Sequence, residues 1–270
     1  MVIRRIITGV SVAVVVALFI WLGDPWFTLA ACLVSLIATF EFYRMVKTDH
    51  TQPLTYLGLV FSILFVLAVH SPFSITCSLL FALITVVPLL WMLFRHNKEN
   101  AFADWGWTVT GILYIGWMLS FYVLIRALDN GIWWVYLVIA CTALSDVFAY
   151  AVGSTVGKHA LASSISPGKT WEGSAGGLAA SIIFALILGT WFQLPLNLWQ
   201  MVVAGLIIGV FSLLGDLVES LLKRNMHTKD AGQLLPGHGG ILDRIDSHLL
   251  IAPVAYYLIL LINNQGWLSS

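Results

Sequence analysis

The chain alternates between apolar runs of roughly 20 residues and short polar breaks rich in glycine, proline and asparagine. A helical run of about 20 residues, at about 1.5 Å per residue, is as long as the hydrocarbon core of a membrane is thick. The pattern therefore predicts an all-α integral membrane protein, a polytopic bundle of about nine transmembrane helices. The predicted spans lie near residues 3–22, 27–43, 54–70, 74–94, 107–127, 132–152, 175–193, 199–222 and 247–263.

Composition supports the membrane class. Of the 270 residues, 60% are hydrophobic and 10% are charged, whereas a soluble domain is about half apolar and about one quarter charged. The first apolar run, Ile6 to Leu22, is longer than the core of a typical signal peptide and has no clear cleavage pattern, so we interpret it as a retained span. No soluble domain or long linker is expected, and the chain should form one integrated membrane-embedded unit.

Basic residues predict the orientation of the chain. With nine spans, twelve of the 13 lysines and arginines fall on one side, and only Arg126 falls on the other. By the positive-inside rule, the N-terminus and the two charged loops are cytoplasmic and the C-terminus is outside. Residues 1–130 would then be a scaffold of five spans, and residues 131–270 a catalytic region of four spans and two cytoplasmic loops.

Two single charges lie near the ends of predicted spans, Glu41 in the second and Arg126 in the fifth. Snorkelling or anchoring at the membrane interface accounts for an isolated charge at such a place. The three cysteines lie inside apolar runs without CxxC spacing, so neither a disulfide framework nor a zinc site is indicated.

The stretch from Ser220 to Asp246 is a polar island between two apolar helices, and we interpret it as the active site. Just before and within it, Asp216, Glu219, Ser220 and Lys223 have the spacing of one helical face. Acidic residues inside a helix end are costly unless they are paired or solvated. A simple Glu219–Lys223 ion pair remains an alternative for those two residues.

Three aspartates flank this island, and their chemistry suits a metal. Asp243 and Asp246 are three residues apart at the start of the last span, and with Asp216 they offer three carboxylates at one membrane boundary. Oxygen ligands of this kind suit Mg²⁺. The glycine-rich turn at 236–240 lets backbone N–H groups approach an anion. Together with the neighbouring lysines and arginines, these features predict phosphoryl or nucleotidyl transfer.

A second polar segment follows the sixth predicted span. Asp146 lies within that span, and a lone acid at such a depth indicates function, although a structural hydrogen bond between helices remains an alternative. Lys169 and Glu172 lie where the seventh span begins, a place where helix N–H groups and a lysine can meet an anion. A capping loop with a solvated lysine is the other interpretation. S-P-G-K-T lacks the spacing and the preceding strand of a phosphate-binding P-loop.

At these residues the sequence resembles a known family. The run S-L-L-K-R-N-M-H-T-K-D-A-G-Q-L-L-P-G-H-G-G-I-L-D-R-I-D, Ser220 to Asp246, looks like the signature of the phosphatidate cytidylyltransferases, or CDP-diacylglycerol synthases. The segment S-P-G-K-T-W-E-G, residues 166–173, resembles the same family. The likeness is sharp from about Ser145 to Pro253. Over the first 130 residues it is one of hydropathy and length.

The resemblance implies the reaction of CTP with phosphatidate to give CDP-diacylglycerol and pyrophosphate. It also implies Mg²⁺ as cofactor, with K⁺ as a second ion, and Asp216, Asp243 and Asp246 as the metal ligands. The catalytic residues would be Asp146, Asp243 and Asp246. The residues that bind substrate would be Ser166, Lys169, Glu172, Ser220, Lys223, Arg224, Lys229, Asp230, His238 and Arg244.

The chain departs from the family pattern at two positions. Val147 stands where many members carry a serine after the aspartate, which would remove a hydrogen bond near Asp146. Ser154 stands where a basic residue commonly follows the glycine, which would remove one phosphate contact. Both departures concern Asp146 and its surroundings, and neither touches the main signature.

These features also predict the setting of the protein. CTP, phosphatidate and the membrane are the expected partners, without nucleic acid, and the base rate for oligomers favours a homodimer. The expected location is a bacterial-type inner membrane with the active site on the cytoplasmic side. Another phosphorylated lipid as acceptor remains an alternative. A transporter is disfavoured because the charges gather at one boundary and no internal repeat is evident.

Overall fold

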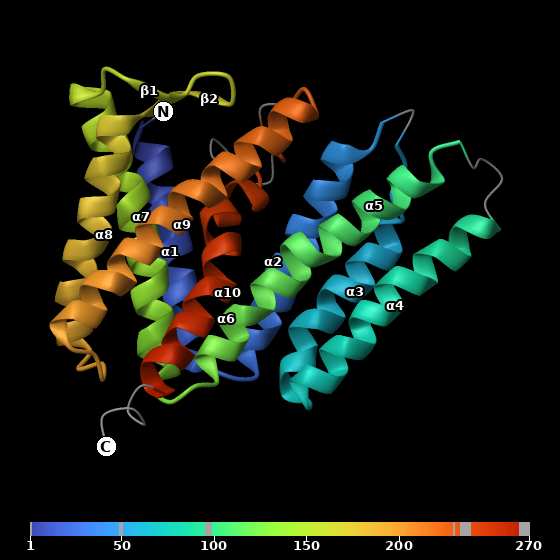
Figure 1. Ribbon diagram of the computed structural model, residues 1–270, viewed down its shortest axis with the longest axis horizontal. Helices are drawn as coiled ribbons and strands as arrows, with labels where there is room; N and C mark the ends of the chain where they lie inside the picture. Colours follow the sequence, from blue (N-terminus) through green and yellow to red (C-terminus); the bar gives the residue numbers. More distant parts are fainter. Residues whose placement is uncertain (1, 49–50, 95–98, 229, 233–238, 265–270) are drawn as a thin grey trace. The chain divides into compact units, whose positions relative to one another are not determined.

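The computed structural model describes residues 2–264 except 49–50, 95–98, 229 and 233–238 (Figure 1). The described residues are mostly α-helical, and many helices are apolar and long enough to cross a membrane, which confirms an all-α integral membrane protein. They pack into two compact units. The first consists of Met1–Leu124 and Met226–Ile245, and the second of Ile125–Asn225 and Asp246–Ser270.

The helices of the first unit come from the N-terminal half of the chain. Between Ala101 and Arg126 the chain forms one continuous helical run, in which a π-helical turn, η2, separates two α-helical parts. The elements are α1 (Val2–Leu22), α2 (Trp26–Val46), α3 (Thr55–Leu67), the 3-10 turn η1 (Ala68–His70), α4 (Phe73–Leu93), α5 (Ala101–Gly111), η2 (Ile112–Trp117) and α6 (Met118–Arg126).

The second unit holds the remaining long helices and a small sheet. Helices α7, α8 and α9 lie side by side in it (Figure 1). The first residues of α10, up to Ile245, pack with the first unit, and the helix continues into the second. The elements are α7 (Gly131–Val156), β1 (Ala160–Ala162), β2 (Ser166–Thr170), α8 (Trp171–Trp191), α9 (Leu198–Asn225) and α10 (Leu242–Asn264).

Every predicted span corresponds to a helix or helical run in the described part of the chain. Seven of these are long and apolar enough to cross a membrane, while Gly9–Leu22 and Thr55–His70 are shorter apolar helices. The count of nine spans and the orientation of the termini therefore stay predictions. The division into a scaffold of residues 1–130 and a catalytic region of residues 131–270 stays a prediction as well.

Several helix ends differ from the predicted ones. Helix α9 continues to Asn225 and α10 begins at Leu242, so both include charged residues that had been assigned to the loop between them. Helix α5 begins at Ala101, before the predicted start at 107. The apolar pattern marks only the part of a helix that lies in lipid. Because helical backbone hydrogen bonds can continue into polar sequence, the helix ends lie beyond the ends of the apolar run.

Tyr43 of α2 lies where α2, α3 and α5 meet in the first unit. Its side chain is fully buried, and its hydroxyl donates a hydrogen bond to the carbonyl oxygen of Thr108 at 2.6 Å. Gly58 of α3 and Gly111 of α5 lie so close to its ring that an added Cβ would overlap with it. Helices approach closely where one of them lacks a side chain. The two glycines thus fix α2, which also carries Glu41, against its neighbours.

Small residues also bring the helices of the second unit together. A Cβ added to Gly177 of α8 would lie 2.7 Å from the carbonyl oxygen of Ser145 on α7. A Cβ on Gly215 of α9 would lie 2.8 Å from the Cα of Ser247 on α10. These close approaches hold the backbone of α7 against α8 and the backbone of α10 against α9, at the level of the acidic residues.

An antiparallel hairpin that was not predicted precedes α8. Strands β1 and β2 pair with Ala160 opposite Thr170 and Ala162 opposite Ser166. The hairpin leads directly into α8, where the Thr170 hydroxyl accepts a hydrogen bond from Gly173 N–H at 3.1 Å and caps the helix. The S-P-G-K-T segment, which lacks the spacing of a P-loop, is thus the second strand of a hairpin and ends in a helix cap.

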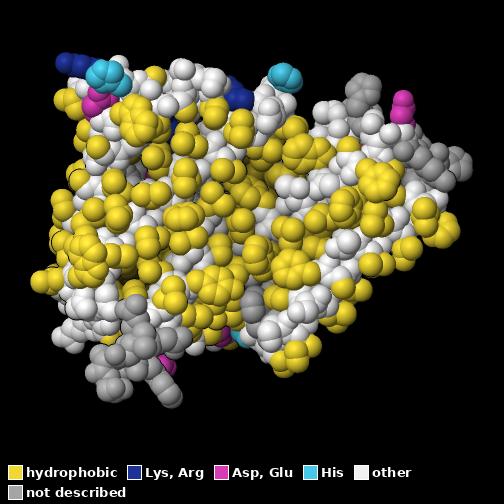
Figure 2. Space-filling model, viewed as in Figure 1, with side chains coloured by type: hydrophobic (Ala, Val, Ile, Leu, Met, Phe, Trp, Pro, Cys, Tyr) yellow, Lys and Arg dark blue, Asp and Glu magenta, His cyan; other side chains and the backbone are white. Residues whose placement is uncertain are grey.

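Apolar side chains cover the helical surfaces on the face shown in Figure 2, and the charged side chains visible there lie near helix ends. Ile75, Val60, Ile183 and Leu261 are each more than half exposed. Exposed side chains of this size and number would be a liability in water but match a lipid environment.

Candidate active site

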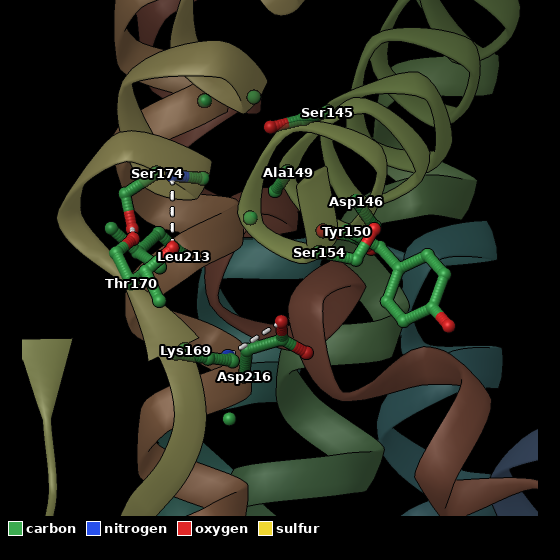
Figure 3. A pocket seen from close by; sticks show the side chains of 15 residues that line it. Ser145, Asp146, Ala149, Tyr150, Ser154, Lys169, Thr170, Ser174, Leu213 and Asp216 are labelled. Carbon is green, nitrogen blue, oxygen red and sulfur yellow. Dashed lines mark hydrogen bonds and ion pairs between the residues drawn. The ribbon is translucent and has the colours of Figure 1, made fainter. Parts of the chain in front are cut away.

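A pocket of about 290 Å³ opens among α7, β2, α8 and α9 in the second unit (Figure 3). Its polar wall contains Asp146 from α7, Lys169 from β2 and Asp216 from α9. Five glycines and several small side chains line most of the rest, together with Tyr150 and Leu213, so the backbone itself forms much of the surface. A ligand can approach backbone N–H groups closely at a surface of this kind.

Helical spacing explains how two of the walls are built. Ser145, Ala149 and Gly153 follow one another at four-residue intervals on α7 and turn the same face to the pocket. On α9 the pocket face carries Gly209 and Asp216, which are seven residues apart. Each wall thus combines small residues with one carboxylate.

Ser247 of α10 links three carboxylates in the second unit. Its hydroxyl lies 3.0 Å from Asp216 Oδ1, 3.3 Å from Asp146 Oδ2 and 3.5 Å from Asp246 Oδ1, and the side chain is buried. Ser212 donates a further hydrogen bond to Asp146 Oδ1 at 2.9 Å. A serine hydroxyl carries one proton and can satisfy only one acceptor at a time. The three acids therefore share this hydroxyl, while Ser212, Lys169 and the Ser247 N–H each give one of them a further donor.

Lys169 supplies the positive charge at this cluster. Its Nζ lies 2.6 Å from Asp216 Oδ2, and the two side chains are 24% and 26% exposed. Asp216 and Asp246 also lie close enough for their carboxyl groups to share a proton. One ammonium group cannot neutralise three carboxylates, so the cluster has the electrostatics of a cation site.

The donor atoms of this cluster fit a magnesium ion chemically. They are carboxylate and hydroxyl oxygens, which are the ligands that hard divalent cations take in proteins. Within the described ranges, no three His, Cys, Asp or Glu side chains are grouped as ligands of a single ion. The Lys169 ammonium and the Ser247 hydroxyl meanwhile contact Asp216, one of the acids that would bind a metal.

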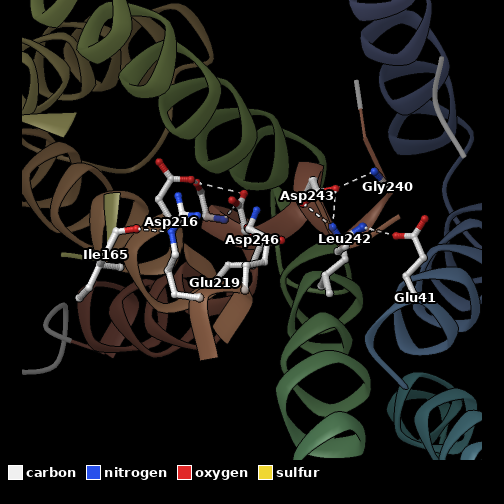
Figure 4. A network of polar contacts seen from close by, with 12 residues as sticks. Glu41, Ile165, Asp216, Glu219, Gly240, Leu242, Asp243 and Asp246 are labelled. Carbon is white, nitrogen blue, oxygen red and sulfur yellow. Dashed lines mark hydrogen bonds and ion pairs between the residues drawn. The ribbon is translucent and has the colours of Figure 1, made fainter. Parts of the chain in front are cut away.

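Asp243 is engaged differently from the other aspartates of the signature. It belongs to the first unit, and its carboxylate accepts hydrogen bonds from Gly240 N–H at 2.7 Å and from Ala231 N–H at 3.1 Å (Figure 4). These bonds join two points of the loop that are nine residues apart in the chain. The structure thus gives Asp243 a role in holding this loop, and its role as a metal ligand stays a prediction.

Two of the predicted substrate-binding residues organise the hairpin. Glu172 Oε2 accepts hydrogen bonds from the backbone N–H groups of Lys158 and His159 at 3.1 and 3.2 Å, and its Oε1 lies 2.5 Å from the His159 ring. Arg224 of α9 donates from Nε to the carbonyl oxygen of Ile165 at 3.1 Å. Both side chains therefore fix the segment that presents Lys169 to the pocket.

The other predicted residues have varied surroundings. Lys223 forms an ion pair with the fully buried Glu219 one turn earlier. This is the ion pair that the sequence spacing left open as an alternative for these two residues. Ser166 and Ser220 are half-buried, while Asp230 and Arg244 are exposed. Lys229 and His238 lie outside the described residues, so their substrate roles stay predictions.

The sequence pattern did not indicate Ser212 or Ser247 as residues of the site, and it indicated a different role for Glu41. Ser212 lies four residues before Asp216 and Ser247 directly follows Asp246, so a search for hydroxyls beside intramembrane acids would have found both. Glu41 was interpreted as a charge anchored at the interface, and this interpretation is wrong. Its side chain is only 6% exposed, and it accepts a hydrogen bond from Leu242 N–H at 2.9 Å.

Comparison with known proteins identifies the family of the chain. Residues 3–262 match the model of the Cytidylyltransferase family, so the chain belongs to that family of membrane-embedded transferases. It is 36% identical over 264 residues to a protein of Bacillus subtilis named phosphatidate cytidylyltransferase, covering 96% of this chain and 97% of the relative. Proteins of the same name from Synechocystis and Mycobacterium bovis are 35% and 31% identical, over 96% and 95% of this chain and 97% and 88% of theirs.

Proposed function

We propose that this chain is a phosphatidate cytidylyltransferase, which transfers CMP from CTP to phosphatidate and releases pyrophosphate. This proposal rests on the full-length likeness to relatives of that name, together with a pocket that brings Lys169 to half-buried carboxylates. Membership of the family supports nucleotidyl transfer, and the exposed apolar helices support a lipid acceptor.

The reaction needs positioning more than it needs a base. A phosphate oxygen of phosphatidate attacks the α-phosphorus of CTP, and the bond from that phosphorus to the oxygen bridging to the β-phosphate breaks. The electron pair leaves with pyrophosphate. Because the attacking phosphate is already an anion at pH 7, no side chain has to remove a proton from it. The enzyme has to hold both anions in line and neutralise their charge.

The residues of the pocket support these tasks. The Lys169 ammonium is the cation available to phosphate oxygens, and its contact with Asp216 keeps it at the pocket wall. The small residues of α7 and α8 leave backbone close to the ligand. Ser212 and Ser247 hold the carboxylates of Asp146 and Asp216 in place.

We further propose that Mg²⁺ is required and that K⁺ is a second ion. Asp146, Asp216 and Asp246 would hold the magnesium, with Asp243 as a further ligand by family resemblance. The bound ion would neutralise phosphate charge as it develops in the transition state. The excess of carboxylates over cations in the cluster supports this proposal.

The proposed setting is a bacterial-type inner membrane with the N-terminus and the active site on the cytoplasmic side and the C-terminus outside. This orientation would let CTP enter from water and phosphatidate from the cytoplasmic leaflet. A homodimer is proposed on base rates for oligomers alone.

The test is an assay of the purified, detergent-solubilised protein with labelled CTP, Mg²⁺ and phosphatidate in mixed micelles. We expect labelled CDP-diacylglycerol and an equal amount of pyrophosphate, and no product when EDTA is in excess over Mg²⁺. If no CDP-lipid forms from phosphatidate or any other phosphorylated lipid, the proposed transfer is wrong. Turnover of a polyprenyl phosphate in preference to phosphatidate would instead contradict the acceptor.

A further inference from the structure

Glu41 is a buried acid in the N-terminal part of the chain, far in sequence from the signature. It lies in α2, 201 residues before its hydrogen-bond partner, and its carboxylate points to the first residue of α10 (Figure 4). Its Oε2 accepts a hydrogen bond from Leu242 N–H at 2.9 Å, and both residues are buried. Leu242 N–H is one of the N–H groups at the start of a helix that have no partner within the helix.

The same carboxylate also lies against two glycines of the loop between α9 and α10, residues 226–241, which we call the signature loop. A Cβ built on Gly232 or on Gly240 would overlap with the Glu41 carboxylate. Only glycine allows the loop backbone to approach a side chain so closely. Glu41 therefore contacts the loop on both sides of residues 233–238 and also contacts the helix that follows.

Asp243 completes this arrangement within the same unit. Its carboxylate accepts hydrogen bonds from the N–H of Gly240, which Glu41 also contacts, and from the N–H of Ala231, which precedes Gly232 in the chain. The two carboxylates thus fix both ends of the loop segment and the first turn of α10. Four residues after Leu242, the same helix carries Asp246, and Ser247 follows it.

We propose that Glu41 is a positioning residue that holds the signature loop and the start of α10 in the geometry that catalysis needs. Glu41 contacts neither substrate in this role. Removal of its carboxylate leaves a helix N-terminus without an acceptor and a void beside Gly232 and Gly240, so these two residues and the start of α10 lose their fixed position. Misplacement of catalytic groups by about 1 Å can lower the rate about 100-fold.

The test compares Glu41→Ala, Glu41→Asp and Glu41→Gln with a matched control, Asp104→Ala. Asp104 is another buried acid of the first unit, and it also accepts a backbone hydrogen bond, from Gln52 N–H at 2.6 Å. We expect Glu41→Ala to lower kcat about 10- to 100-fold. Asp104→Ala should leave kcat within about threefold, even where both variants lower the melting temperature equally.

Two further variants separate positioning from general destabilisation. Glu41→Gln keeps an oxygen that can accept the Leu242 N–H bond, so it should retain most of the wild-type kcat. Glu41→Asp keeps the charge but withdraws the carboxylate by one methylene group, so it should resemble Glu41→Ala. If Glu41→Ala does not fold, Glu41→Asp gives the same comparison.

Hydrogen exchange measured by mass spectrometry gives a readout that does not depend on activity. Peptides covering residues 226–245 should exchange faster in Glu41→Ala and Glu41→Asp but not in Asp104→Ala. Unchanged exchange in this segment, or an equal loss of kcat in the control, would overturn the proposal. This role presupposes the proposed function, but an inactive wild type would refute only that function, because the exchange result tests the loop contact by itself.

Discussion

Few charged side chains lie in and beside the pocket, so each of them has a large effect on its chemistry. Ser247 is a buried hydroxyl placed among Asp146, Asp216 and Asp246, and Lys169 is the cation that touches Asp216. Each acidic group there is held by hydrogen bonds of modest individual strength. A hydroxyl that serves several acceptors in a low-dielectric site affects all of them together.

Ser247→Ala tests whether this hydroxyl supports turnover. We expect kcat to fall about tenfold or more, because the carboxylates lose their shared donor and reorient. The matched control is Ser120→Ala, which removes a buried serine hydroxyl that donates to the carbonyl oxygen of Trp117 at 2.6 Å, outside the cluster. Each variant should lose about 1 kcal/mol of stability. Steady-state kinetics and thermal unfolding in detergent measure both effects, and equal kcat values in the two variants would contradict a special role for Ser247.

Lys169→Gln tests the cation of the pocket. We expect kcat/KM for CTP to fall about 100-fold, because one donor aimed at phosphate charge is typically worth a factor of that order. Lys158→Gln is the control, since Lys158 is an exposed lysine of the neighbouring segment and should be dispensable. The assay with labelled CTP measures both variants. Normal kcat/KM in Lys169→Gln would show that Lys169 serves only to neutralise Asp216.

At the scale of elements, close helix packing places these side chains. Helices α8 and α9 meet at Gly205, where an added Cβ would lie 2.6 Å from the Cα of Ile182. Transmembrane helices associate through such small residues because lipid offers little hydrophobic driving force. The pocket walls on α8 and α9 depend on this contact, although Gly205 itself does not line the pocket.

Gly205→Ala should therefore destabilise the protein by about 1–3 kcal/mol, the usual cost of overpacking a close contact. Gly106→Ala is the control. Gly106 also lies inside a helix, but an added Cβ there meets nothing within 4 Å. Alanine should leave stability unchanged or raise it by about 0.5–1 kcal/mol, because alanine favours the helix. Thermal unfolding of both variants in one detergent measures the difference, and an equal melting temperature would contradict the packing argument.

Elements also show what the sequence could and could not predict. Apolar run length located every helix, because the thickness of the membrane limits it directly. The hairpin at 160–170 was missed, because its strands are short and rich in residues that usually indicate turns. The sequence also indicated four candidate site residues, because a charge inside or beside an apolar helix is costly and therefore conspicuous. They are Asp146, Lys169, Asp216 and Asp246.

The partners of these residues could not be predicted in the same way. Ser247 and Ser212 reach Asp146 across helices, so their roles depend on how α7, α9 and α10 are rotated. Glu41 and Leu242 are 201 residues apart, and nothing in local spacing connects them. Asp243 and Asp246 are three residues apart, and this spacing suggested that both bind one metal ion. The hydrogen bonds described for Asp243, however, come from N–H groups of the loop.

At the scale of the whole molecule, the length of one short apolar run determines how many helices cross the membrane. The run Thr55–His70 is 16 residues long, which corresponds to about 24 Å of helix against about 30 Å of hydrocarbon. Thinning of the bilayer can accommodate such a mismatch at modest cost. The predicted placement of twelve basic residues on one side holds only if this run crosses, because otherwise every later loop would change sides.

Reporter fusions after residues 98, 129 and 270 test this topology. We expect green fluorescent protein, which fluoresces only if it stays in the cytoplasm, to be bright after residue 98 and dark at the other two positions. Alkaline phosphatase, which is active only outside, should show the opposite pattern. The physical reason is that twelve of the 13 basic residues then face the cytoplasm and only Arg126 faces out. If Thr55–His70 did not cross, all three positions would report the opposite side, and the polar island with its carboxylates would face away from CTP.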